Sequence, residues 1–190
     1  MTTRIITLFL SLSLMLALCA VGVANPLQGR DHLTPQEVDL VKDAQILDKR
    51  VEIFIKAVDR RMLVINNSAE ANAKLLKKDS EKWGELPTGT RAQLMSDISR
   101  IFDEAITNID DVSARDEKNP LIPKALRKLA TAATRIVEQL KPIAGQIKGD
   151  SETSTFDQLT ENAESIIQAA NKLPAAVEKK SKNKSEKTTN

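Results

Sequence analysis

The chain has 190 residues, of which 41% are hydrophobic and 28% are charged, and its formal net charge is +2. These proportions are ordinary for a globular protein and exclude a fibrous or wholly disordered chain. One cysteine and one histidine are present, so an internal disulfide is excluded and histidine-based catalysis would have to use His32.

The first 24 residues have the layout of a secretory signal peptide. Arg4 is their only charge, a long apolar run follows it, and Gly22 and Ala24 occupy the small-residue positions of a cleavage site. We therefore expect cleavage after Ala24 and export to the periplasm or the extracellular space. Two alternatives use the same residues: an uncut membrane anchor, or a lipoprotein modified at Cys19. Only in these two cases do we expect the protein to be attached to a membrane.

A polar leader is expected at 25–33, and the first helix begins directly after it. Thr34 and Glu37 have the spacing of a capping box, and Pro35 suits the first helical position. Apolar residues then recur every three or four positions, which predicts one amphipathic helix over 35–65. The predicted stripe consists of Leu40, Ala44, Leu47, Val51, Phe54, Val58, Met62 and Ile65, and it is widened by Ile46, Ile53 and Ile55.

The helical pattern weakens at 66–68, where Asn, Asn and Ser favour turns. It then resumes at Ala69, Leu76 and Trp83. One helix over 35–83 would be about 70 Å long. Because no later helix could cover that length, we expect a break or kink near Asn67.

The third helix is expected after a connection at 84–90 that contains two glycines and a proline. Thr90 and Gln93 form a second capping box. The stripe that follows predicts a helix ending near Ser113 and consists of Leu94, Ile98, Ile101, Ala105, Ile109 and Val112, supported by Phe102 and Ile106.

The segment 116–130 contains the next helix start. Pro123 disfavours helical geometry in the residue before it, so the fourth helix is predicted to begin at Pro123. Leu121 and Leu126 then have the spacing of a hydrophobic staple. Connections between rigid helices also carry binding sites, so Leu121, Ile122 and Trp83 are the candidate partner contacts.

Pro142 is expected to kink or end the fourth helix. A polar linker follows, and the last helix is predicted to start at Ser154 or Thr155 and to close at Pro174. The tail over 174–190 has five lysines and two glutamates, and this composition predicts disorder. The tail therefore carries a charge of +3, against −2 for residues 25–173.

The third helix carries an acidic face formed by Asp103, Glu104, Asp110 and Asp111. A metal centre in a helical bundle would need Glu-x-x-His pairs, which the sequence lacks. Phosphate-binding glycine loops are also absent. We therefore expect no cofactor, metal site or catalytic residue. The basic tail contains no aromatic residue for stacking on bases, so no nucleic-acid partner is expected.

These patterns predict an all-α fold: an up-down bundle of four to five amphipathic helices over 34–173. The function expected for it is that of an exported, non-enzymatic protein that binds a protein partner, self-associates or scaffolds an envelope complex. The alternative is a bundle that binds a small ligand or metal on the acidic face of the third helix. A hydrolase that uses a pair of carboxylates is a third interpretation.

Overall fold

The computed structural model describes residues 30–174. Contacts define one unit of the chain that begins at Asp31. The predicted cleavage site at Ala24, the alternative lipid site at Cys19 and the lysine-rich segment 175–190 lie outside the described residues.

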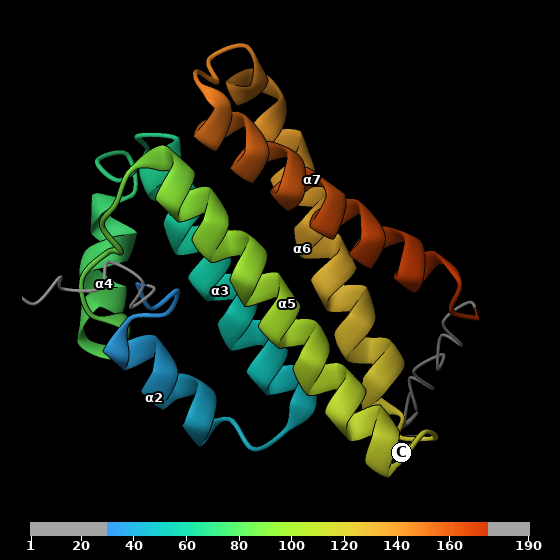
Figure 1. Ribbon diagram of the computed structural model, residues 1–190. Helices are drawn as coiled ribbons and strands as arrows, with labels where there is room; N and C mark the ends of the chain where they lie inside the picture. Colours follow the sequence, from blue (N-terminus) through green and yellow to red (C-terminus); the bar gives the residue numbers. More distant parts are fainter. Residues whose placement is uncertain (1–29, 175–190) are drawn as a thin grey trace, which may run out of the picture. The chain divides into compact units, whose positions relative to one another are not determined.

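The described residues form helices and no strand, which confirms the all-α class. Six helices are present in this part of the chain where four to five were expected, because one predicted helix is divided. Labelled as in Figure 1, they are α2 (Pro35–Asp43), α3 (Leu47–Ile65), α4 (Ala73–Trp83), α5 (Arg91–Arg115), α6 (Leu121–Ala144) and α7 (Asp150–Asn171).

The four long helices α3, α5, α6 and α7 pack on one another, and successive ones alternate in direction (Figure 1). α7 packs on α5 and α6, whereas α3 packs on the other side of the same two helices. The short helices α2 and α4 contact each other, and α2 also packs on α3. Within residues 30–174, α7 therefore has neighbours on one side only, and α5 and α7 lie side by side in the same direction.

The core lies where the apolar stripes of the four long helices meet. Burial of these side chains removes apolar surface from water, which is the main favourable contribution to folding. Ile147 and Leu33 pack there as well, so the end of the expected leader joins the helical unit. The fully buried members include Val51, Phe54, Ile98, Phe102, Leu129, Ile136, Leu159 and Ala163.

Both predicted capping boxes are present. Thr34 Oγ1 accepts a hydrogen bond from the Glu37 backbone N at 3.3 Å, and Glu37 Oε2 accepts one from the Thr34 N at 2.9 Å. Thr90 and Gln93 repeat this arrangement at the start of α5. The break predicted near Asn67 is also confirmed, since α3 ends at Ile65 and α4 begins at Ala73.

The continuous helix predicted over 35–65 is wrong, because the chain turns at 44–46. Gln45 Nε2 donates to the Lys42 carbonyl at 2.8 Å, and Arg50 Nε donates to the Ala44 carbonyl at 2.9 Å. These side chains bind carbonyl groups that a continuing helix would have paired. The turn leaves Ile46 55% exposed, whereas the stripe had assigned it to the core.

Two predicted helix starts are also wrong. α6 begins at Leu121, two residues before Pro123, and Asn119 Oδ1 accepts a hydrogen bond from the Leu121 backbone N at 3.0 Å. Proline is tolerated there because N–H groups of the first turn have no acceptor within the helix. Leu121 is therefore the first helical residue and not the outer half of a staple. Pro142 lies inside α6, which ends two residues later at Ala144.

α7 begins at Asp150, four residues before the expected start at Ser154. The segment interpreted as a polar linker supplies its first turn. Asp150 and Glu152 lie in that turn, where carboxylates interact favourably with the positive end of the helix dipole. Glu152 also accepts hydrogen bonds from Arg91 Nε at 2.5 Å and from the Lys148 backbone N at 2.8 Å, which joins the starts of α5 and α7.

Candidate functional site

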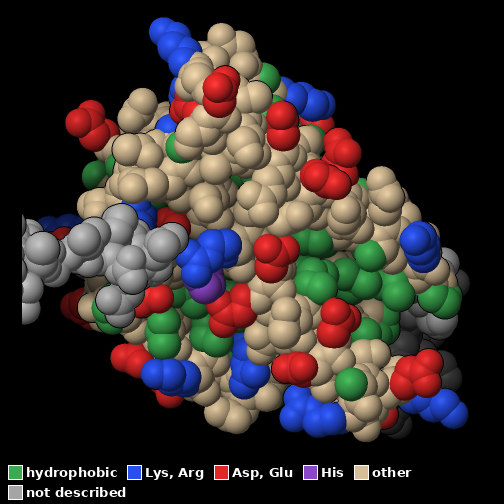
Figure 2. All heavy atoms as spheres, in the orientation of Figure 1, with side chains coloured by type: hydrophobic (Ala, Val, Ile, Leu, Met, Phe, Trp, Pro, Cys, Tyr) green, Lys and Arg blue, Asp and Glu red, His purple; other side chains and the backbone are tan. Residues whose placement is uncertain are grey.

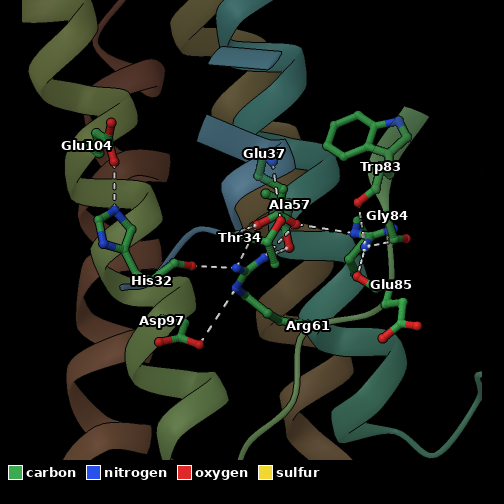
Figure 3. A network of polar contacts seen from close by, with 11 residues as sticks. His32, Thr34, Glu37, Ala57, Arg61, Trp83, Gly84, Glu85, Asp97 and Glu104 are labelled. Atoms are coloured by element: carbon green, nitrogen blue, oxygen red, sulfur yellow. Dashed lines mark hydrogen bonds and ion pairs between the residues drawn. The ribbon is translucent and has the colours of Figure 1, made fainter. Parts of the chain in front are cut away.

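A network of buried charges holds α2 against α3. Glu37 is 0% exposed, and its carboxylate accepts hydrogen bonds from Arg60 Nε at 3.2 Å and from Arg61 Nη2 at 2.8 Å. Figure 3 shows Glu37 directed at Arg61 beside the Thr34 cap. One carboxylate therefore completes a helix cap and neutralises charge on two adjacent arginines.

Arg60 extends this network to the connection between α4 and α5. Its Nη2 atom donates to the carbonyls of Trp83 at 3.1 Å and Gly84 at 3.2 Å, and also to the carbonyl of Glu85. The guanidinium lies 5.8 Å from the centroid of the Trp83 ring. Burial lowers the pKa of Arg60, and the charge of Glu37 opposes that shift.

Arg61 connects the same network to α5 and to the segment before α2. It lies 3.9 Å from Asp97 on α5, and it donates to the backbone carbonyls of Ala57 at 2.7 Å and of His32. His32 Nε2 in turn donates to Glu104 Oε2 at 2.6 Å. Glu37, Arg60, Arg61 and Asp97 are each no more than 4% exposed, so these charges are closed to a substrate. The network is best interpreted as structural.

A second charge cluster joins α3 to α6. Asp48 is 3% exposed and contacts Lys124 at 2.5 Å and Lys128 at 3.1 Å. The hydrogen bonds from these lysines lower the pKa of Asp48 to about 2. Lys128 also binds Glu52 and lowers the pKa of that carboxyl.

A groove lies between α5 and α7, on the face where α7 has no further neighbour within residues 30–174. Its hollow has a volume of about 360 Å³. The apolar part of the lining is Ile106, Ile166 and Ala169, and the polar part is Asp103, Thr107, Asn162 and Ser165. Figure 2 shows hydrophobic side chains gathered between these two helices, with Asp and Glu side chains around them.

Asp103 lies at the edge of this groove. Its Oδ1 atom accepts a hydrogen bond from Asn162 Nδ2 at 3.0 Å, and the same amide donates to Ser99 Oγ at 2.6 Å. Although Asp103 is exposed, neighbouring groups partly desolvate its carboxyl, and this desolvation raises its pKa. A cation placed at the edge of the groove would favour the charged form of Asp103.

The structure places the predicted partner contacts in two separate regions. Leu121 and Ile122 are half-buried in the first turn of α6 and pack against the core. Trp83 is 7% exposed at the end of α4 and packs beside Arg60. In this conformation Trp83 offers little surface to a partner, and these residues do not form one patch with the groove.

The acidic residues considered for a metal site are spread along α5. Glu104 binds His32, whereas Asp103 lies at the groove. Among residues 30–174, no group of three or more His, Cys, Asp or Glu side chains is placed to hold a metal ion. Within the same range, no helix is both long and apolar enough to cross a membrane.

Sequence reasoning identified Glu37 only as a capping residue and did not identify the groove. A signal for the buried network was present: two arginines interrupt the apolar run at 57–65. The groove had no comparable signal, because Ile106 and Ile166 resemble ordinary core residues.

Comparison of the chain with protein-family models, with curated proteins and with solved structures finds no match.

Proposed function

We propose that this is an exported, non-enzymatic helical protein that binds a protein partner through the α5–α7 groove, on an up-down bundle scaffold. The observation that supports binding is the groove between α5 and α7, a hollow of about 360 Å³ that combines apolar side chains with a few polar groups, as binding sites do. Export rests on the signal-like sequence that ends at Ala24.

The arrangement of ionisable groups supports a non-enzymatic role. The most deeply buried ones, Glu37, Arg60 and Arg61, are bound to one another and to backbone carbonyls. An acid–base catalyst must reach the proton that it transfers, which these closed side chains cannot do. Among the described carboxyl groups, that of Asp103 is the only one that both lines the groove and has a raised pKa.

Crosslinking from the groove tests the proposal. A photo-reactive phenylalanine analogue replaces Thr107 or Ser165, which lie on opposite walls of the groove, in the full chain expressed in its own cells. The control replaces Thr131, which is exposed on α6. We expect the same partner peptide to be attached at both groove positions, identified by mass spectrometry, and not at position 131.

A second variant distinguishes a partner bound in the groove from a protein that is crosslinked only because it happens to be nearby. Ala169→Phe would fill the hollow, and we expect it to abolish the adduct from position 107 while the thermal melt stays cooperative. An adduct that is equal from positions 107 and 131, or that survives Ala169→Phe, would contradict binding in the groove.

A small-ligand function is the second candidate, and the partly desolvated carboxyl of Asp103 beside apolar residues favours it. Such a site suits a small molecule with an amine and an apolar body. A rise in melting temperature with a panel of such amines, lost in Asp103→Asn, would support this function over protein binding.

A further inference from the structure

Charged groups are distributed unevenly over the described helices. α7 contains five acidic residues and no lysine or arginine. Asp157, Glu161 and Glu164 on α7 are exposed, as are Asp110 and Asp111 on α5. None of these five carboxylates has an ion-pair partner within residues 30–174.

Buried and half-buried acidic residues elsewhere in the unit are paired, whereas exposed ones such as Glu70, Glu81 and Glu117 have no ion pair within residues 30–174. Asp48 binds Lys124 and Lys128, and Asp59 binds Arg135 at 2.5 Å. Glu152, at the far end of α7, binds Arg91. At the groove itself, the carboxylates without an ion pair within residues 30–174 are Asp103, which lines it, and Asp110, which lies two turns further along the same side of α5. A basic partner would be attracted to this face and oriented on it.

The groove has the dimensions of a helix-binding site. Its α7 wall runs from Asn162 to Ala169, which corresponds to about 10 Å at 1.5 Å per residue. This length accommodates two turns of a helix, and so two apolar side chains that are three or four residues apart. A helix laid between α5 and α7 would cover Ile106 and Ile166 as a neighbouring bundle helix does.

We propose, building on the function proposed above, that the segment bound in the α5–α7 groove is a basic amphipathic helix of a partner protein. Its apolar side chains contact Ile106, Ile166 and Ala169. Its lysines or arginines face Asp103 and Asp110 on the α5 side. Asp103 is the one carboxylate among the lining residues of the groove, and it accepts a hydrogen bond from Asn162.

Two other occupants fit the groove less well. A second copy of the chain would bring the same acidic face against this one, and like charges oppose such pairing. The chain's own segment 175–190 is basic, but its only apolar residues are Ala175, Ala176 and Val177. They are adjacent in sequence and offer no pair of large side chains spaced by one helical turn.

Three synthetic 18-residue peptides test the charge and the shape of the occupant. The first carries leucines at helical spacing and lysines elsewhere, the second has glutamates in place of the lysines, and the third has alanines in place of the leucines. Binding to protein purified from cells that express the full chain is measured by NMR chemical-shift changes. We expect the first peptide to bind at least tenfold more tightly than either of the others, with shifts centred on Ile106 and Ile166.

Charge variants of the full chain locate the site. In the double variant Asp103→Asn, Asp110→Asn, binding of the basic peptide should weaken about two- to fivefold for each charge removed. The matched control, Glu70→Gln with Glu81→Gln, removes two exposed charges near and on α4 and should leave binding unchanged. Equal binding of the acidic peptide, or no effect of the groove variant, would overturn the proposal.

A separate measurement tests whether the chain's own segment 175–190 occupies the groove. If the basic peptide binds only after all five lysines at 179, 180, 182, 184 and 187 are replaced by glutamine, that segment is the occupant and the proposal is wrong. A cellular crosslink from position 107 to an acidic or uncharged segment would instead support partner binding in the groove. It would contradict the proposal that the bound segment is basic.

Discussion

Glu37 connects local helix chemistry to the assembly of the unit. Its backbone and side chain complete the cap of α2, and the same carboxylate accepts hydrogen bonds from both buried arginines. The cap could be predicted from the spacing of Thr34 and Glu37 alone. The second role could not, because it depends on how α2 lies against α3, which is set by the unpredicted turn at 44–46.

We predict that Glu37→Gln destabilises the protein by about 3 kcal/mol, because it leaves the charges of Arg60 and Arg61 buried without their carboxylate. The midpoint of urea unfolding, followed by circular dichroism, measures this change. Glu70→Gln, at an exposed position, should change the free energy of unfolding by less than about 0.5 kcal/mol.

Replacing the three charged residues together distinguishes charge burial from lost packing. The triple variant Glu37→Met, Arg60→Met, Arg61→Met should recover most of the stability that Glu37→Gln loses, since it removes the carboxylate together with both arginines that bind it. A triple variant that is less stable than Glu37→Gln would show that the arginines act mainly by binding the backbone carbonyls at 83–85.

At the scale of helices, several helix ends were predicted correctly where residues at the end itself favour a cap or a turn. The two capping boxes and the Asn-Asn-Ser break are of this kind. The missed turn at 44–46 and the wrong start of α7 involve contacts with residues several positions away. Arg50 binds the Ala44 carbonyl after α2, and Arg91 binds Glu152 at the start of α7. No local propensity signals these two contacts.

Gly84 ends α4 in a conformation that favours glycine, with φ of 65° and ψ of −162°. A Cβ atom there would also lie 3.0 Å from the Gln36 side chain on α2. We predict that Gly84→Ala costs about 2 kcal/mol of stability, measured by urea unfolding, because the backbone strain would persist after Gln36 moved away.

Gly145→Ala is the matched control for this prediction. Gly145 follows α6 with φ of −71°, and a methyl group added there would have no neighbouring atom within 4 Å. The substitution should be neutral or stabilise the protein by about 0.5 kcal/mol, since it restricts the unfolded chain. Equal losses in the two variants would mean that the conformation of Gly84 does not limit stability.

For the whole molecule, the ion pairs between helices predict a loss of stability in acid. The lysines around Asp48 lower its pKa from 3.8 to about 2, and Lys128 also lowers the pKa of Glu52. Groups whose pKa is lower in the folded state stabilise it above the unfolded pKa and lose that effect as the pH falls through the folded pKa. The free energy of unfolding should therefore decrease between about pH 4 and pH 2. Asp59 and Asp103, whose pKa values burial raises, oppose this trend.

Asp48→Asn tests the contribution of the α3–α6 cluster. The variant should be less stable than the unmodified protein at pH 7, and the difference should shrink as the pH falls from about 4 to about 2. Urea midpoints at several pH values measure it. A difference that stays constant over this range, as expected for the exposed control Asp116→Asn, would exclude the ionised Asp48 as the cause.

The placement of α7 has a consequence for how the chain is made. α7 forms one wall of the core but is the last helix in the described part of the chain, and it contributes Leu159, Ala163 and Ile166. During synthesis, the apolar faces of α5 and α6 that pack on α7 remain exposed until α7 has been made. Such surfaces are recognised by chaperones and promote aggregation. A pause in translation before residue 171 would therefore prolong the period in which the nascent chain needs protection.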